Sequence, residues 1–258
     1  MAADHVPDAA ATAVGMVTVW WANPHSLRPW HLELLSTVET DKWRAYIRQA
    51  DRDRSALAAV LLRLVAAAAT GEPPRSIRIG RDCQTCGKPH GRPRLVDHGY
   101  EVSVSHSGQR VVVAITDAGP VGVDVEQITQ VDLTELATAV LADDEQLTEP
   151  QDFFVYWTRK ESLVKATGEG LRVPLREVVV STPAEPPALR RYPGRQMTAV
   201  LVDLHPGDGH IAALAVVGTP AVQVDERDAA LLLADRRDAP TSGPADVPDH
   251  GAAGRDAR

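Results

Sequence analysis

The sequence predicts an α+β (α/β) protein in which short strands alternate with helices. Two segments have the period of an α-helix, and several others are runs of alternating or β-branched apolar residues, which is the pattern of strands. The helical segments are residues 51–70 and about 148–166. The predicted strands are residues 14–22, 101–105, 110–116, 121–128, 174–181, 197–204 and 210–217.

The first long helix is predicted from its apolar face. In DRDRSALAAVLLRLVAAAAT (51–70) the charged residues crowd the start, and Leu57, Leu61 and Leu64 recur at helical spacing. Gly71 follows directly, and glycine commonly ends a helix. This segment should therefore pack one face on a core.

Turn and cap signals mark the second helix and a hairpin. The run Thr148-Glu149-Pro150-Gln151 is typical of a capping box with proline in the first turn, and the helix should continue to about Ala166, before Gly168. Residues 106–109 (HSGQ) join two strand patterns as a hairpin turn. Along the sequence, one predicted helix thus precedes this group of strands and the other follows it.

The bulk composition excludes several classes of protein. The chain has 258 residues, 44% of them hydrophobic, and no apolar run reaches the roughly 20 residues of a membrane span. The net charge of -8 disfavours a general nucleic-acid binder. The first 15 residues carry two Asp and no Lys or Arg, unlike a secretory signal, so we expect a cytoplasmic protein.

The charge is distributed unevenly along the chain. Residues 42–110 hold 13 Lys and Arg against 6 Asp and Glu, whereas residues 121–158 hold nine acids and no Lys or Arg. A basic region can bind anions, and an acidic region can bind a metal ion.

Asp124 and Glu126 are two acids in an otherwise apolar strand. Because side chains alternate along a strand, both carboxylates should point to the same side. One explanation is a strand with a solvated face. The other is that two oxygen ligands on a rigid strand hold a divalent cation such as Mg²⁺.

Glu161 and Lys165 lie one turn apart on the second helix and therefore share a face. Alone they would be read as a surface ion pair. Together with Asp124 and Glu126 they suit a phosphate-processing site, in which carboxylates hold a metal and an ammonium group holds or protonates phosphate oxygens.

These residues carry a resemblance to a known family. VGVDVE (121–126), followed by WTRKESLVKATGEGL (157–171), resembles the paired signature of the 4'-phosphopantetheinyl transferases of the larger, surfactin-synthetase-activating type. The two motifs occur in the family's order and spacing. The wider resemblance runs from about residue 14 to 218 and is densest from 101 to 180.

The resemblance implies an enzyme of the holo-[acyl-carrier-protein] synthase type. Such an enzyme moves the phosphopantetheine arm of coenzyme A to a serine of an acyl or peptidyl carrier protein and releases 3',5'-adenosine bisphosphate. It implies Mg²⁺, with Mn²⁺ as a substitute, held by Asp124, Glu126 and Glu161. It also implies that Glu161 and Lys165 are catalytic, Glu161 as base for the serine hydroxyl and Lys165 at the phosphate.

The resemblance further implies a grip on coenzyme A in the basic part of the chain. The residues that match family contacts to the phosphates are Arg54, Arg92, Ser105, His106, Lys160 and Lys165. A turn histidine bonded to the backbone is the other explanation for His106. Lys42, Arg44 and Arg48 are plausible outer contacts or a solvated helix face.

One motif is not required by this family. CQTCGKPHGRP (83–93) places Cys83, Cys86 and His90 close in sequence, and with His98 they could bind zinc. The alternative is a glycine-rich turn that positions Arg92 and leaves the thiols free. Ile128 stands where some relatives carry a threonine that contacts phosphate.

The family resemblance also implies the domain organisation. We expect a pseudo-twofold monomer of two similar halves with the ligand in the cleft between them. The parts are a flexible N-terminus (1–13), an N-terminal half that grips coenzyme A (14–118), a C-terminal half with the metal and the catalytic helix (119–219), and a mostly disordered tail (220–258) with a short helix at 226–236.

Two other functions are compatible with the residues alone. A Mg²⁺-dependent phosphatase or phosphodiesterase would use the same carboxylates and would hydrolyse its substrate without a carrier protein. A non-catalytic module would bind coenzyme A or a carrier protein. The larger transferase type often serves secondary-metabolite synthases.

Overall fold

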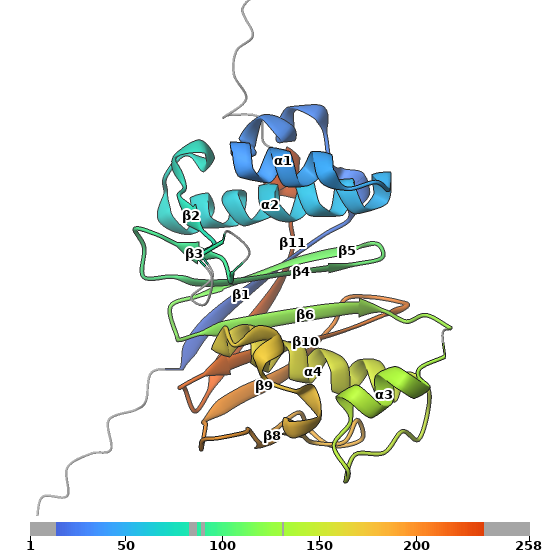
Figure 1. Cartoon of the computed structure of the whole chain (residues 1–258). Coiled ribbons are helices and arrows are strands. Elements are labelled where there is room, and N and C mark those ends of the chain that lie inside the picture. Colours follow the sequence, from blue (N-terminus) through green and yellow to red (C-terminus); the bar gives the residue numbers. More distant parts are fainter. Residues whose placement is uncertain (1–13, 83–86, 89–90, 131, 235–258) are drawn as a thin grey trace, which may run out of the picture.

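The alternating and helical patterns of the sequence fold into a mixture of sheets and helices, so the predicted α+β class is confirmed. The structure, a computed structural model, describes residues 14–82, 87–88, 91–130 and 132–234 (Figure 1). The strands are β1 (Gly15–Ala22), β2 (Ile79–Gly80), β3 (Arg94–Leu95), β4 (Glu101–Ser107), β5 (Arg110–Thr116), β6 (Val121–Gln127), β7 (Val179–Val180), β8 (Leu189–Arg191), β9 (Ala199–Leu204), β10 (His210–Val217) and β11 (Val222–Asp228). The α-helices are α1 (Thr37–Ala45), α2 (Gln49–Thr70), α3 (Thr134–Val140), α4 (Asp152–Thr167) and α5 (Ala230–Ala234). Short 3₁₀ turns are η1 (Pro24–Ser26), η2 (Pro29–Leu34), η3 (Pro74–Ser76), η4 (Gly170–Arg172) and η5 (Leu175–Glu177).

The first sheet has the strand order β11-β1-β5-β4. β4 and β5 form the predicted hairpin, and β1 pairs antiparallel with β5. The leucine and alanine face of α2 is buried against this sheet, with Leu57, Leu61 and Leu62 fully buried. Gly71 ends α2 in the left-handed conformation, at φ 77°, which a residue with a side chain adopts only at a cost.

The second sheet has the antiparallel order β6-β10-β9, and α4 packs across it. Gly122 in β6 sets how closely α4 approaches. A Cβ atom at this position would lie 1.9 Å from the carbonyl oxygen of Ser162, so any larger residue would push the helix away. This close contact brings the side chains of α4 to the carboxylates of β6.

The two sheets face each other across an apolar core. β1 and β5 contribute Val17, Val19 and Val112, which are fully buried against valines of β6 and β10. Figure 1 shows α2 and α4 on opposite sides, with the strands between them. The expected pseudo-twofold relation between the halves stays a prediction.

The prediction of a mostly disordered tail after residue 220 is wrong for its first part. β11 pairs in parallel with β1, and Trp21 Nε1 donates a 2.8 Å hydrogen bond to Glu226 of β11. Ala229 and Leu233 are buried in the core under α2. The predicted helix at 226–236 is the short α5, because β11 continues to Asp228. Residues 1–13 and 235–258, also predicted to lack order, lie outside the described residues.

A buried histidine links this C-terminal segment to the first half. His31 is fully buried, and its Nδ1 accepts a 2.9 Å bond from the backbone N–H of Arg28. Its Nε2 lies 3.1 Å from the carbonyl oxygen of Leu233, to which it donates in that tautomer. Residues 220–234 are thus part of the packed domain, and the division near 118–120 is crossed by β11.

Two other boundaries differ from the prediction. α4 begins at Asp152, and not at the predicted cap: the carboxylate of Asp152 accepts the backbone N–H groups of Thr148 and Glu149 at 2.8 and 2.9 Å. The predicted strand 174–181 reduces to η5 and the two-residue β7. Within the described residues, no helix combines the length and apolar character needed to cross a membrane.

The buried and exposed leucines of α5 provide a test of the ordered segment. Leu233 is 5% exposed and Leu231 is 85% exposed. We expect Leu233→Ala to lower the free energy of unfolding by about 2 kcal/mol or more, as for other core leucines. Leu231→Ala should change it by less than about 0.5 kcal/mol. Chemical denaturation of both variants measures this difference. If both substitutions had equally small effects, α5 would not be packed in the core, and the prediction of a disordered tail would hold for it.

Candidate functional site

The two acids of β6 face the hydroxyl groups of β4. Ser105 Oγ donates a 2.8 Å bond to Asp124 Oδ1, and Ser107 Oγ donates a 2.8 Å bond to Glu126 Oε2. Asp124 is 3% exposed, which contradicts a solvated strand face at this position. The predicted alternation thus places both carboxylates on one side, at the junction of the two sheets.

The helix α4 adds the second half of the predicted set. Lys165 Nζ donates to Asp124 Oδ1 at 2.6 Å, to Ser105 Oγ at 2.9 Å and to the carbonyl oxygen of Val123 at 3.1 Å. Glu161 lies one helical turn before Lys165. Lys165 is therefore a tertiary contact that joins α4 to both β4 and β6, and not a surface ion pair.

The carboxylates of this site disfavour each other's ionised form. Burial raises the pKa of Glu161, the negative charge of Asp124 adds to this rise, and Lys165 opposes it. Burial also raises the pKa of Glu126, and Asp124 adds to it, while the bond from Ser107 and the charge of Lys165 oppose it. Three acids close enough to interact in this way have an excess of negative charge that a cation would neutralise.

One carboxylate oxygen in this group has no partner. Asp124 Oδ2 is buried and makes no hydrogen bond, which is costly for a charged oxygen. Carboxylate oxygens are the ligands that Mg²⁺ and Mn²⁺ prefer. Among the described residues, no three acidic, His or Cys side chains converge tightly enough to form a complete metal site. A hard ion here would draw its other ligands from water or from phosphate oxygens.

Cationic side chains gather beside the carboxylates. His106 is exposed to solvent on one side, but desolvation by the surrounding protein lowers its pKa, and the positive charges of Lys165, Arg54 and Lys42 lower it further, against a bond to its own backbone that raises it. These residues come from β4, α4, α2 and α1. Arg54 donates a 3.2 Å bond to the carbonyl oxygen of Gly108 and pairs with Asp51. Four elements thus form a positive surface suited to an anion.

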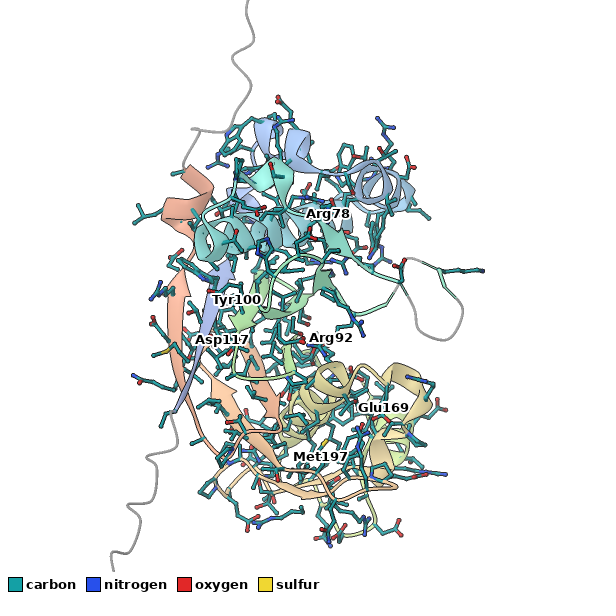
Figure 2. All side chains as sticks on the ribbon, turned by 90° about the vertical axis from the view of Figure 1, so that its left-hand side faces the viewer. Arg78, Arg92, Tyr100, Asp117, Glu169 and Met197 are labelled. Carbon is teal, nitrogen blue, oxygen red and sulfur yellow. The ribbon has the colours of Figure 1, made fainter. Side chains whose placement is uncertain are left out.

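Arg92, which lies just before β3, contacts α4. Its Nη1 donates a 2.9 Å bond to the carbonyl oxygen of Ala166, and it pairs with Glu101. Figure 2 shows Arg92 between the strands of the first half and α4. Burial lowers its pKa, opposed by Glu101. Arg92 thus stabilises the C-terminal end of α4. Its contact to a phosphate group stays a prediction.

The structure contradicts the predicted phosphate contact of Lys160. Its side chain is fully buried, and its Nζ donates to the carbonyl oxygens of Val140 (2.6 Å) and Leu175 (3.2 Å) and to the carboxylate of Glu145. Burial lowers the pKa of Lys160, opposed by Glu145. Because all three of its protons are used inside the fold, Lys160 is a structural residue. Its spacing of four from the buried Tyr156 is the sequence signal for this role.

Ser103 and Ser107 are two further polar residues of the site, which the sequence motifs did not identify. Both lie on the face of β4 that meets β6, and their spacing of two from Ser105 is the signal that could have identified them.

Three of the four side chains predicted to bind zinc fall outside the part of the chain that the structure describes. Cys83, Cys86 and His90 lie outside the described residues. His98 Nε2 lies 3.5 Å from Glu72, and Ile128 is 37% exposed at the end of β6.

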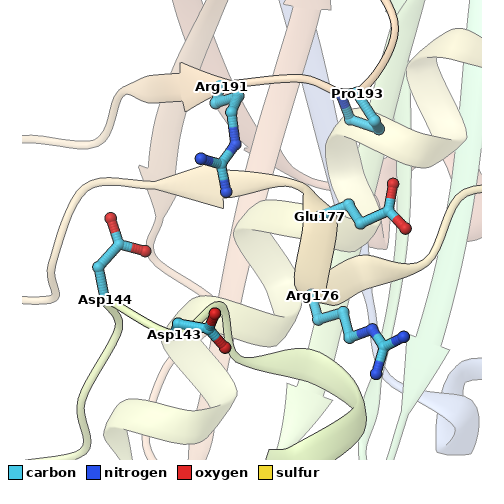
Figure 3. Close-up of a pocket in the computed structure, with 6 residues that line it drawn as sticks. All are labelled: Asp143, Asp144, Arg176, Glu177, Arg191 and Pro193. Carbon is cyan, nitrogen blue, oxygen red and sulfur yellow. The ribbon is translucent and has the colours of Figure 1, made fainter.

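A separate hollow of about 730 Å³ lies in the second half (Figure 3). It is lined by Asp143, Asp144, Arg176, Glu177, Arg191 and Pro193. None of these residues belongs to the carboxylate site or to the cationic surface beside it. The hollow therefore has no part in the predicted chemistry.

The two lysines of α4 provide a matched pair of variants. Lys160→Met leaves Glu145 charged and buried without its partner, and we expect it to lower the free energy of unfolding by about 3–5 kcal/mol. Lys165→Met should cost less stability, because the side chain of Lys165 is 30% exposed and Asp124 keeps the bond from Ser105. Adding Glu145→Gln to Lys160→Met should recover part of the loss. Denaturation curves measure this, and a stable Lys160→Met protein that fails only to bind ligand would restore the phosphate role.

Comparisons with known proteins agree with the paired motifs. The family model of the 4'-phosphopantetheinyl transferase superfamily matches residues 120–215. The chain is 32% identical over 168 residues to 4'-phosphopantetheinyl transferase HetI of a Nostoc species, a match covering 61% of this chain and 68% of HetI. It is 31% identical over 153 residues to the transferase gsp of Aneurinibacillus migulanus (55% of this chain, 61% of gsp) and 30% identical over 154 residues to Sfp of Bacillus subtilis (56% and 65%).

The matches to these relatives span about three fifths to two thirds of the relatives' lengths. The range of the family model includes the region that forms β6 and α4. The predicted family is confirmed, and so is its class as a transferase: the chain belongs to the 4'-phosphopantetheinyl transferase superfamily.

Proposed function

We propose that this chain transfers the phosphopantetheine arm of coenzyme A to a serine of an apo acyl or peptidyl carrier protein and releases 3',5'-adenosine bisphosphate. The observation that carries the proposal is the buried carboxylate of Asp124, which contacts Lys165 on one oxygen and leaves the other without a partner. Carboxylates beside an ammonium group suit a diphosphate with a bound cation. The names of the relatives support this reaction.

The proposal includes Mg²⁺, with Mn²⁺ as a substitute, held by Asp124, Glu126 and Glu161. The donor chemistry fits a hard cation, since all three residues offer oxygen and Asp124 Oδ2 is free, and Glu126 and Glu161 would turn toward the ion, because the three carboxylates do not converge in the described residues. When bound, the ion would neutralise charge on the diphosphate. The raised pKa values of Glu126 and Glu161 support this role, because a cation relieves the repulsion among their charges.

Glu161 is the proposed acceptor of the serine proton. Burial and the charge of Asp124 raise the pKa of Glu161 in the metal-free chain, which favours a carboxylate that takes up a proton. As the serine Oγ–P bond forms, the hydroxyl proton passes to Glu161, and the P–O bond to the adenosine bisphosphate breaks. One oxygen of Glu161 can face the ion while the other accepts the proton.

Lys165 is the proposed partner of the phosphate oxygens. Its ammonium group lies between β4 and β6, 2.6 Å from Asp124, and is 30% exposed. A diphosphate at this place would receive one of its protons, and the departing oxygen gathers negative charge that the ammonium group offsets.

The grip on coenzyme A is assigned to the cationic surface beside the carboxylates. Arg54 and His106 are its central members, with Ser105 and Arg92 at its border with α4 and Lys42 on α1. An uncharged His106 can still donate a hydrogen bond to a phosphate oxygen. The 3'-phosphate and the diphosphate of coenzyme A match this excess of positive charge.

We also propose that the protein is a monomer in the cytoplasm, without nucleic-acid or membrane partners, and that it serves carrier domains of secondary-metabolite synthases. The carrier protein and coenzyme A are its partners in the reaction.

Mass spectrometry of an apo carrier protein tests the reaction. With the chain, coenzyme A and Mg²⁺, the carrier should gain the mass of one phosphopantetheine on its serine. Glu161→Gln should abolish the gain while coenzyme A still binds, because the variant lacks the proton acceptor and one metal ligand. Glu177→Gln, an exposed glutamate of the separate hollow, is the control and should keep full transfer. Failure of every acyl and peptidyl carrier tried would contradict the proposal, and hydrolysis without a carrier would indicate the phosphatase alternative.

The raised pKa of Glu161 predicts a pH-dependent stability in metal-free buffer. The folded protein disfavours the ionised form of Glu161. The contribution of Glu161 to the free energy of unfolding is therefore highest at low pH, where Glu161 is protonated, and it falls as pH rises through the raised pKa. Glu161→Gln cannot ionise. We therefore expect its advantage in free energy of unfolding over the wild type to grow between about pH 4 and pH 7.

Urea denaturation at several pH values, with a chelator present, measures this difference. A difference that stays constant or shrinks with rising pH would contradict the raised pKa. Glu177→Gln is again the matched control.

A further inference from the structure

Three serines alternate along β4 and share one face. Ser103, Ser105 and Ser107 point toward β6, whereas Val102 and Val104 between them pack on the core under α2. A polar row on the inner side of a sheet needs partners, because an unpaired buried hydroxyl is costly.

The outer two serines bind the backbone of β6. The N–H of Val123 donates to Ser103 Oγ at 3.0 Å, and the N–H of Gln127 donates to Ser107 Oγ at 3.1 Å. Both pairs are twenty residues apart, so β4 and β6 run parallel in register although they belong to different sheets. The other edge of β6 pairs with β10. Side-chain hydroxyls thus take the place of backbone pairing where the two sheets meet.

Ser107 does more than hold the strand. A hydroxyl has one proton, and that of Ser107 goes to Glu126 Oε2 at 2.8 Å while its oxygen accepts the N–H of Gln127. Ser107 therefore connects the Glu126 carboxylate to β4. The oxygen atom of Ser107 also binds the backbone of the next residue, Gln127. Ser103 makes the same kind of backbone bond but touches no carboxylate.

We propose that Ser107 is a positioning residue that orients the Glu126 carboxylate toward the bound divalent cation. This inference rests on the proposed function, since it assumes that Glu126 is a ligand. Hydrogen bonds to metal-ligating carboxylates fix their orientation, and the loss of such a partner commonly weakens metal binding by 10–100-fold. Without the bond, Glu126 would have to be ordered by the ion itself.

The structure supplies a matched control. Ser107→Ala and Ser103→Ala each remove one hydroxyl that accepts a backbone N–H of β6 at nearly equal distance. Only Ser107→Ala also removes a bond to a carboxylate. Ser107→Thr keeps the hydroxyl and tests rescue, and Asp124→Asn tests whether the site binds metal at all.

The experiment titrates Mn²⁺ into each full-length variant with coenzyme A present and follows free Mn²⁺ by electron paramagnetic resonance, after subtraction of binding to coenzyme A alone. Thermal unfolding of each variant reports its folding. We expect Ser107→Ala to weaken Mn²⁺ binding by about tenfold or more. Ser103→Ala should lower thermal stability to a similar degree without this loss, and Ser107→Thr should restore most of the binding.

Two results would overturn the inference while leaving the metal site intact. One is Ser107→Ala binding Mn²⁺ as tightly as the wild type while Asp124→Asn does not. The other is Ser103→Ala losing as much affinity as Ser107→Ala, which would make strand spacing the cause. If Asp124→Asn also binds normally, the metal assignment of the proposed function fails together with the inference.

Discussion

The contact between Asp124 and Lys165 is the interaction on which the site depends. Asp124 is buried in β6, and Lys165 reaches it from α4 while also binding Ser105 of β4. A buried ion pair is weak evidence for stability, because desolvation offsets its attraction, but removal of one partner leaves a costly charge. Because Lys165 of α4 binds residues of β4 and β6, the pair holds the helix and both sheets in one relative position. This requires the close approach of α4 to β6 that the absence of a side chain at Gly122 permits. The same geometry leaves Asp124 Oδ2 facing no partner, which is where the proposed cation acts.

Local patterns predicted the parts of the site that depend on spacing along one element. The alternation of β6 predicted that Asp124 and Glu126 share a side, and the helical period predicted that Glu161 and Lys165 share a face. Lys160 shows the limit of such reasoning. It belongs to the same motif as Glu161, yet its ammonium group is buried against Glu145, fifteen residues earlier, and makes no contact with the carboxylate site. Only the packed fold decides which lysine of a motif is buried.

The errors in the fold arose where a segment depends on distant partners. β11 holds four charged residues in seven, and it becomes a strand because it pairs with β1, whose residues lie about two hundred positions earlier. The two-residue β7 follows the short turn η5 directly. Because the apolar residues of both elements form one run along the chain, the sequence could not distinguish this arrangement from a longer strand. Ser103 and Ser107 of β4 were equally hard to interpret, since their partners lie on β6 in a neighbouring sheet: backbone N–H groups for both serines and, for Ser107, also the carboxylate of Glu126.

The most direct measurement of the central claim is a crystal structure of the chain with coenzyme A and Mn²⁺, with anomalous scattering used to locate the ion. We expect one peak bonded to Asp124 Oδ2, with Glu126 and Glu161 around it, Lys165 beside the diphosphate, and Lys160 still buried against Glu145. A peak away from Asp124, or a diphosphate bound without any contact to Lys165, would contradict the central claim.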